Sequence, residues 1–397
     1  GAALGVWMAV WWLSEAIPVY ATALLPLVVL PLSGATPVHD AAAPYAHELI
    51  YLFLGGFLIA LAMQRWGLHR RVALAALLLC GDQPVRIVGG FMAVTAFLSM
   101  WVSNTAAAVM LLPVAVSIVE RVARQYGLES ADAAIREPGS PVRNLALCLL
   151  LGIAYAASIG GMGTPIGTPP NVLMLSYVKD HLGVEIGFAR WMALALPLLA
   201  VFLPLAWLLL TRVLYPVRLG RIEGGRALMR ENLRALGPMS TGERIVLGVF
   251  VAAAGLWITR PLLTGIELGG ARPLAGLTDP GIAMLAALVL FVAPVDRRFS
   301  RFALDWETAL QVPWGVLLLF GGGLSLAAAI QANGVGELIA GQVAGFAGVP
   351  PLLVLAVVVV GIVFLTELTS NTATAATLIP ILAALAPGLG IEPIVLA

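Results

Sequence analysis

One stretch of the chain occurs twice. Residues 95–113 read TAFLSMWVSNTAAAVMLLP and residues 362–380 read IVFLTELTSNTATAATLIP, which match at nine of nineteen positions without a gap, at an offset of 267 residues. Each copy carries Ser-Asn-Thr in the middle of a long apolar run and ends in proline. Burying polar groups is unfavourable unless they find partners. The duplication therefore indicates two matched polar sites within apolar surroundings.

The composition identifies these surroundings as a lipid bilayer. Hydrophobic residues make up 60% of the chain and charged residues 11%, whereas soluble proteins carry about 25% charged residues. The 397 residues leave room for about ten membrane segments of ~20 residues. We therefore predict an all-α polytopic membrane protein. Its net charge of +1 provides no evidence for a nucleic-acid partner, and we expect none. Two cysteines provide neither a disulfide framework nor a Cys/His metal cluster. Gly1 lies inside an apolar run, which indicates an incomplete N-terminus.

Both copies of the repeat lie in apolar runs that are too long for one membrane helix. Residues 87–119 contain no charge. As one helix they would be ~50 Å long, against an apolar core of ~30 Å. Ser103 is the midpoint, so we predict a re-entrant hairpin with the triplet at its tip. Residues 351–387 repeat this pattern around Ser370 and predict a second hairpin. Irregular backbone at that depth is tolerated where it lines a cavity or is buried in protein.

A third overlong run, residues 144–178, is interrupted by GGMGTPIGTPPN at 160–171. Four glycines and three prolines in these twelve residues cannot continue an α-helix. This composition predicts a broken transmembrane helix. Other spans are predicted at 1–13, 17–33, 48–64, 191–211, 245–263, 278–294 and 309–330, with an interfacial helix at 68–85 and a polar connection at 331–350.

The repeat includes a second motif, and its two copies are expected to have opposite orientations. LFLGGFLIALAMQRWG at 52–67 aligns with LFGGGLSLAAAIQANG at 319–334, at the same offset. If both hairpins turn back without crossing, all but four of the 22 basic residues fall on the cytoplasmic side, as the positive-inside rule requires. Inverted repeats with broken helices are typical of secondary transporters. The offset also predicts a partner for residues 167–171 beyond Ala397, so we expect the last broken helix to be missing from this sequence.

The hairpin tips combine groups that bind anions with groups that bind cations. Helix N-termini present N–H groups to an anion, while unwound carbonyls and Ser, Thr and Asn oxygens suit a hard cation. No Lys, Arg or His lies between Arg86 and Arg121 or after Arg301. A bound polyanion would therefore need co-bound cations, which favours cation-coupled uptake over an arginine-based exchanger. The alternative for each triplet is that its hydroxyls bond back to their own helix or pack at a small-residue interface.

Five segments carry a resemblance to a known family: WWLSEAIPVYATALLPLVVLPL, LFLGGFLIALAMQRWGLHRRVAL, SMWVSNTAAAVMLLP, GTPIGTPPNVL and TELTSNTATAATLIP. In these segments the chain resembles the divalent anion/sodium symporters of dicarboxylate, citrate and sulfate, which include the INDY-type carriers. It implies a homodimer with a scaffold and a transport domain that moves as an elevator. We accordingly expect scaffold helices at 1–86, a transport unit with the first hairpin and broken helix at 87–211, a cytoplasmic connection and scaffold helices at 212–330, and the second hairpin at 331–397.

The resemblance also assigns binding residues. It implies a first sodium site formed by Ser99, Ser103, Asn104 and the carbonyl of Gly167. It implies a second sodium site formed by Thr366, Thr369, Asn371 and a carbonyl of the missing helix. Substrate carboxylates are expected to meet Ser103, Asn104, Thr105, Thr168, Pro169, Ser370, Asn371 and Thr372.

We predict sodium-coupled import of a C4-dicarboxylate such as succinate, malate or fumarate across a bacterial inner membrane. Citrate or sulfate symport and sodium-independent dicarboxylate exchange are alternatives within transport. A dicarboxylate-binding membrane sensor is the alternative from another class. No catalytic site is predicted, because no His/Asp or Cys/His constellation lies within the apolar runs. The expected partners are the lipid bilayer, sodium ions, a small anionic substrate and a second copy of the chain.

Overall fold

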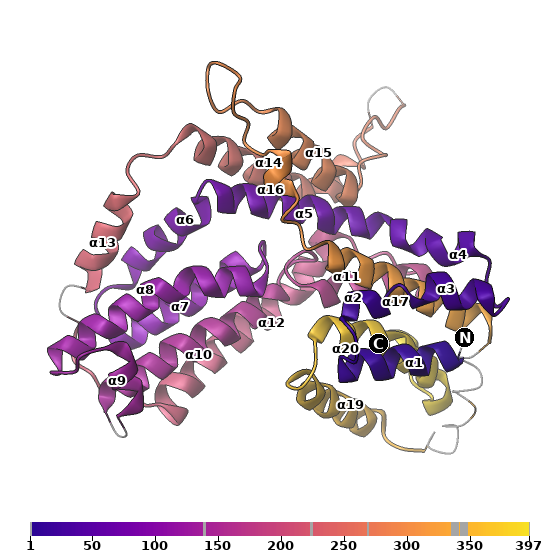
Figure 1. Ribbon diagram of the computed structural model, residues 1–397, viewed down its shortest axis with the longest axis horizontal. Helices are drawn as coiled ribbons and strands as arrows, with labels where there is room; N and C mark the ends of the chain where they lie inside the picture. The colour runs from indigo at the N-terminus through magenta and orange to yellow at the C-terminus, as the bar shows by residue number, and fades with distance from the viewer. Residues whose placement is uncertain are drawn as a thin grey trace. The chain divides into compact units, whose positions relative to one another are not determined.

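The computed structural model describes residues 2–137, 140–222, 225–267, 270–334, 341 and 348–396, and Figure 1 shows their helices. In these residues the regular structure is helical, apart from one isolated β-bridge between Pro294 and Phe302. This confirms the predicted all-α architecture. Seven helical segments are long and apolar enough to cross a membrane, namely Val38–Arg65, Asn104–Gln125, Pro141–Gly161, Phe188–Leu214, Thr241–Leu263, Trp314–Ala332 and Asn371–Leu389.

Both predicted hairpins have a helix break at the triplet. In the first, α7 (Pro84–Ser99) is followed by α8 (Asn104–Gln125). In the second, α19 (Pro351–Thr366) is followed by α20 (Asn371–Leu385). In both pairs the first helix begins and ends at positions that the repeat offset aligns. The second helix of each pair also begins at an aligned position. The duplication therefore extends from sequence motifs to helix boundaries.

Serine residues explain where the second helix of each pair begins. Ser103 caps α8, accepting a hydrogen bond on Oγ from the Ala106 backbone N–H at 3.3 Å. Ser370 caps α20 in the same way, accepting from the Ala373 N–H at 3.5 Å. Serine is among the residues favoured at this position, because its side-chain oxygen pairs with an N–H that has no partner inside the helix.

The predicted broken helix is also present. It consists of α10 (Pro141–Gly161) and α11 (Pro169–Leu182), with residues 162–168 outside either helix. Pro169 opens α11, where its missing N–H and fixed φ are tolerated. The glycines and prolines of this segment therefore end one helix and start another, as the sequence predicts.

The other predicted spans are helical as well. They correspond to α1 (Ala2–Ser14), α2 (Val19–Thr22) with α3 (Leu25–Leu32), α5 (Glu48–Arg65), α12 (Phe188–Leu208), α14 (Thr241–Leu263), α15 (Asp279–Val292) and α17 (Trp314–Ala332). The predicted interfacial helix is α6 (Leu68–Leu77), and the shorter helices are α4 (Val38–Ala42), α9 (Ala131–Arg136), α13 (Gly225–Ala235), α16 (Trp306–Ala309) and α21 (Pro393–Leu396). Most of the predicted connection at 331–350 lies outside the described residues.

The chain divides into two compact units. The terminal unit contains Gly1–Leu54, Pro169–Ile186 and Pro313–Ala397, and the central unit contains Gly55–Thr168 and Gly187–Val312. Within the terminal unit, α20 packs against α1, α11 and α17. Within the central unit, α10 packs against α7 and α8, which run beside it in Figure 1. The predicted division into scaffold and transport domains stays a prediction.

Glycine allows α7 and α10 to approach each other at backbone distance. A Cβ atom added to Gly160 would overlap the backbone of Ala96. Any larger residue would push the two helices apart, which is the usual reason for glycine at a close approach of backbones. The contact holds the C-terminal end of α10 beside the end of α7, where the first tip begins.

Candidate functional site

The first tip, Met100–Ser103, brings polar atoms of α7, α8 and α10 together. Ser99 is fully buried at the end of α7. Its Oγ lies 2.7 Å from Asn104 Oδ1 and 2.7 Å from the Ala157 carbonyl oxygen. A hydroxyl carries a single hydrogen, so Ser99 donates fully to only one of these two acceptors. The oxygen atoms of Ser99, Asn104 and Ala157 therefore lie together around the single hydroxyl hydrogen of Ser99.

Two glycines allow the backbone at and after the end of α10 to come close to Ser99 and Asn104. A Cβ atom on Gly161 would lie 2.5 Å from Asn104 Oδ1. A Cβ atom on Gly167 would overlap the Gly161 carbonyl oxygen and lie 3.0 Å from the Ser99 carbonyl oxygen. We call Ser99, Asn104, Ala157, Gly161 and Gly167 the oxygen cluster.

The oxygen cluster contains three of the four residues predicted for the first sodium site. Ser99, Asn104 and Gly167 are brought together by α7, α8 and the break after α10. The fourth, Ser103, is exposed and uses its Oγ to cap α8. The assignment of these residues as sodium ligands stays a proposal, but their shared location is now a structural observation.

The chemistry of the cluster suits a hard monovalent cation. Its side-chain and backbone oxygens are all neutral, and hard cations prefer oxygen ligands. Transition metals prefer imidazole and thiolate ligands. No group of three or more His, Cys, Asp or Glu side chains that could hold a metal ion occurs in the part of the chain that the structure describes.

Sequence reasoning missed three contributors to the first tip. The Ala157 carbonyl and Gly161 belong to the oxygen cluster, and Thr164 fixes the tip from the segment after α10. Thr164 is fully buried and its hydroxyl donates to the Met100 carbonyl. The glycine-rich motif predicted a helix break here. It could not predict which of its groups face α7.

The second tip, Glu367–Ser370, is organised by bonds within its own hairpin. Thr366 Oγ1 donates to the Val363 carbonyl at 3.0 Å, and Thr369 Oγ1 donates to the Leu365 carbonyl at 2.9 Å. The Thr369 and Thr374 hydroxyl oxygens lie 2.8 Å apart across the break between α19 and α20. These contacts resemble ordinary back-bonding of Ser and Thr in membrane helices.

The second tip is also far more exposed than the first. Asn371 is exposed, and α19 has no buried residue. By contrast, α20 buries Ala373, Thr374 and other side chains within the terminal unit. The second sodium site expected from Thr366, Thr369 and Asn371 therefore stays a prediction.

The residues predicted to bind substrate are divided between the two units. The central unit contains Ser103, Asn104, Thr105 and Thr168, and the terminal unit contains Pro169, Ser370, Asn371 and Thr372. The structure describes each set by itself. A substrate site formed by both sets stays a prediction.

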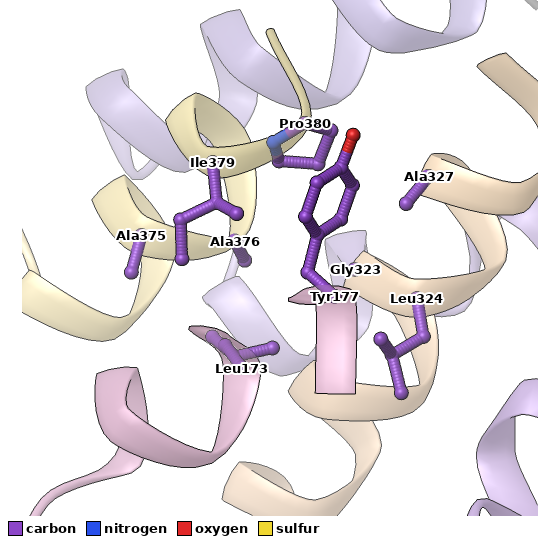
Figure 2. Close-up of a pocket in the computed structure, with 9 residues that line it drawn as sticks. All are labelled: Leu173, Tyr177, Gly323, Leu324, Ala327, Ala375, Ala376, Ile379 and Pro380. Atoms are coloured by element: carbon purple, nitrogen blue, oxygen red, sulfur yellow. The ribbon is translucent and has the colours of Figure 1, made fainter. Parts of the chain in front are cut away.

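A cavity within the terminal unit differs in character from the predicted substrate site. Figure 2 shows Tyr177 beside the apolar side chains that line this cavity between α11, α17 and α20. The lining residues are Leu173, Tyr177, Gly323, Leu324, Ala327, Ala375, Ala376, Ile379 and Pro380. None of these side chains is charged, and the Tyr177 hydroxyl is the one polar group among them. A dicarboxylate needs several donors or cations, so this cavity does not provide its site.

Comparisons with known proteins place the chain among membrane transporters. Residues 2–397 match the family described as "Sodium:sulfate symporter transmembrane region". The chain is 40% identical over 395 residues to a protein of Staphylococcus aureus (strain USA300) named sodium-dependent dicarboxylate transporter SdcS. This match covers 99% of the chain and 74% of that relative. Proteins of the same name from strains bovine RF122 / ET3-1 and MSSA476 show the same identity and coverage.

Proposed function

Because the chain belongs to the family of the sodium:sulfate symporter transmembrane region, we propose that it imports a C4-dicarboxylate together with sodium. Membership makes the chain a multi-pass membrane transporter rather than an enzyme, with sodium as a transported ion. The relatives named sodium-dependent dicarboxylate transporters support the dicarboxylate as substrate class. We propose succinate, malate or fumarate as the transported C4-dicarboxylate.

The oxygen cluster of the first tip is the observation that carries this proposal. Sodium would bind among the oxygens of Ser99, Asn104 and Gly161, with the Gly167 carbonyl completing the site. Asn104 has an oxygen for the cation and an amide N–H₂ that can donate to a carboxylate. Sodium binding at Oδ1 would orient this amide, so that a filled cation site prepares the anion site.

Charge balance supports coupling between the two solutes. A C4-dicarboxylate carries two negative charges, and neither hairpin has a basic residue within its apolar run. Transfer of an unpaired charge through a bilayer is strongly unfavourable. Sodium ions bound beside the substrate would supply the missing positive charge. The N-terminus of α8 would add partial positive charge beside Asn104, because the dipoles of the helix backbone are aligned with their positive ends toward it.

The repeat supports a symmetrical extension of this site. We propose that the two hairpins are inverted copies, with a second sodium ion held by Thr366, Thr369 and Asn371. The substrate carboxylates would then meet Ser103, Asn104, Thr105, Thr168, Pro169, Ser370, Asn371 and Thr372. In this scheme the hairpins move together as an elevator against a scaffold that forms a homodimer.

Uptake into proteoliposomes tests the proposed function. The purified protein would be reconstituted and supplied with radiolabelled succinate, under an inward sodium gradient or a matched potassium gradient. We expect accumulation with sodium alone. Unlabelled malate and fumarate should compete strongly, and citrate and sulfate weakly.

Three other results would assign a different function. Accumulation that is equal under both gradients would contradict symport and indicate sodium-independent exchange. Stronger competition by citrate or sulfate than by malate would change the substrate class. Succinate binding to the purified protein without any uptake would indicate a membrane sensor.

A further inference from the structure

Trp101 occupies the first tip between Ser99 and Ser103, and its ring is surrounded by aromatic side chains of other helices. It is stacked on Phe188 at 6.1 Å and on Trp257 at 6.4 Å, and meets Phe250 edge-on at 4.9 Å between ring centroids. Phe188 and Trp257 stack on each other at 4.6 Å. Offset-stacked and edge-on pairs of this kind are favourable beyond the apolar area that they bury.

The helices that form this aromatic cluster are fixed by an ion pair. Asp279, at the start of α15, pairs with Arg260 of α14 at 2.7 Å. Its carboxylate also accepts the Phe188 backbone N–H at 2.9 Å, and its carbonyl accepts the Trp257 indole N–H at 3.0 Å. The starts of α12 and α15 and the end of α14 are thereby joined. The aromatic side chains that contact Trp101 are therefore held in place by bonds that do not involve Trp101.

The position of Trp101 depends on its ring and not on its indole N–H. The Trp101 N–H is buried and has no hydrogen-bond partner among the described residues. Five other tryptophans each donate their indole N–H to a backbone carbonyl, namely Trp12, Trp66, Trp191, Trp207 and Trp257. A buried donor without a partner is unfavourable. The aromatic contacts must therefore more than offset this penalty.

The first tip is consequently held on two sides. On one side, the Thr164 hydroxyl donates to the carbonyl of Met100. On the other side, the ring of Trp101 is inserted into the aromatic cluster. Ser99 and Asn104, which share the oxygen cluster, flank these two anchored residues along the chain. A shift of the tip would move both cation ligands.

Among the described residues, the second tip has no equivalent anchor. The sequence repeat aligns Trp101 with Leu368. Leu368 is 86% exposed, whereas Trp101 is 9% exposed. Since the repeat keeps the triplet and the helix breaks, this difference identifies a property specific to the first tip.

We propose that Trp101 is a positioning residue for sodium: its ring docks the first tip against α12 and α14 and so sets the geometry of the oxygen cluster. The inference rests on the proposed function, because it assigns the cluster to sodium. It adds a residue that touches neither sodium nor substrate.

Sodium-dependent thermal stability tests this role without requiring transport. Unfolding of the purified protein would be followed while NaCl replaces KCl at constant ionic strength. For Trp101→Ala we expect the sodium concentration giving half of the stabilisation to rise about tenfold, because several aromatic contacts are lost. Trp101→Phe keeps a ring and should stay within about threefold of the unsubstituted protein. Leu368→Ala is the matched control at the second tip and should leave the half-saturating sodium concentration unchanged.

The outcomes separate the two proposals. If Trp101→Ala lowers the unfolding temperature but leaves the half-saturating sodium concentration unchanged, Trp101 has a structural role only. This result overturns the inference. The inference is also overturned if Trp101→Phe is as impaired as Trp101→Ala. If the unsubstituted protein shows neither a sodium-dependent shift nor sodium-driven succinate uptake, the proposed function fails and the inference fails with it.

Discussion

The two hairpins share a triplet, a capping serine and a helix break at matching positions, yet their tips differ in their surroundings. At the first tip, Ser99 is fully buried and its hydroxyl meets oxygens from two other helices. At the second tip, the equivalent Thr366 is half-buried and donates to a carbonyl of its own helix. The triplet therefore does not make a cation site by itself. At the first tip, the broken helix adds Ala157, Gly161 and Gly167 beside Ser99 and Asn104, and we propose that this makes the difference.

The largest effect is expected from removing the amide of the first tip. Asn104→Ala takes away Oδ1, which is shared with the Ser99 hydroxyl, and the amide proposed to meet substrate. We expect sodium-driven succinate uptake to fall roughly a hundredfold or more, since the lost oxygen ligand and the lost amide donor each contribute ~1–3 kcal/mol. Asn333→Ala is a matched control, because Asn333 is exposed and its amide donates to its own helix. Near-normal uptake by Asn104→Ala would remove the first tip from the transport site.

A smaller but still large effect is expected from a single methyl group. In Gly161→Ala the added Cβ would lie 2.5 Å from Asn104 Oδ1, so the tip must shift. Overpacking of this kind usually costs about 1–3 kcal/mol, and we expect the half-saturating sodium concentration for uptake to rise about tenfold or more. Gly255→Ala in α14 is the control, because no atom lies within 4 Å of its added Cβ. An unchanged sodium dependence in Gly161→Ala would contradict the assignment of the cluster to sodium.

Removing the aligned hydroxyls of Ser99 and Thr366 compares how much each tip contributes to sodium dependence. Ser99→Ala should raise the half-saturating sodium concentration about tenfold, because it removes a buried group with two close oxygen neighbours. Thr366→Ser keeps the hydroxyl and should have little effect. Thr366→Ala should act in the same direction as Ser99→Ala but more weakly, because the Thr366 hydroxyl is less buried and bonds within α19. Sodium titration of uptake compares the three variants, and an equal loss in Ser99→Ala and Thr366→Ala would show that the tips are equivalent.

The smallest effect concerns a charge pair that only the first repeat copy possesses. Arg65 at the end of α5 pairs with Asp305 at 2.5 Å, and the repeat aligns Arg65 with Ala332. The backbone N–H of Thr308, followed by the Thr308 hydroxyl and Arg65, holds the pKa of Asp305 below its usual 3.8. A carboxyl with a lowered pKa in the folded state stabilises the protein above its unfolded pKa. This contribution is lost as the pH falls below 3.8 through the folded pKa.

Asp305→Asn tests this pair. Because Asp305 is 45% exposed, we expect the free energy of unfolding at pH 7 to fall by less than ~1 kcal/mol. The difference from the unsubstituted protein should shrink as the pH is lowered below the usual aspartate pKa. Thermal unfolding between neutral and acidic pH measures both effects, with the exposed Glu307→Gln as control. A difference that grows on acidification would contradict the sign of the pKa shift.

The helix breaks were predictable from sequence because their causes are local. A polar triplet at the middle of an overlong apolar run marked each tip, and glycines and prolines marked the interruption between α10 and α11. Capping by Ser103 and Ser370 acts over three residues, so it depends little on the rest of the fold. The repeat offset then predicted the position of the second hairpin from that of the first.

The partners of the tips were not predictable in the same way, because they come from distant parts of the chain. The Ala157 carbonyl lies 58 residues from Ser99 in sequence, and a backbone carbonyl has no sequence signature. The insertion of Trp101 among Phe188, Phe250 and Trp257 depends on how α12 and α14 pack beside the first hairpin. The repeat therefore predicted the same surroundings for both tips, because sequence identity at the triplets contains no information on their burial.

Simultaneous measurement of sodium and succinate fluxes tests the coupling at the first tip most directly. Proteoliposomes containing the unsubstituted protein or Asn104→Ala would be given radioactive sodium and labelled succinate together. We expect the unsubstituted protein to take up both solutes, each dependent on the other, and Asn104→Ala to take up neither. Succinate uptake that continues without sodium, or that survives in Asn104→Ala, would contradict a sodium site at the first tip.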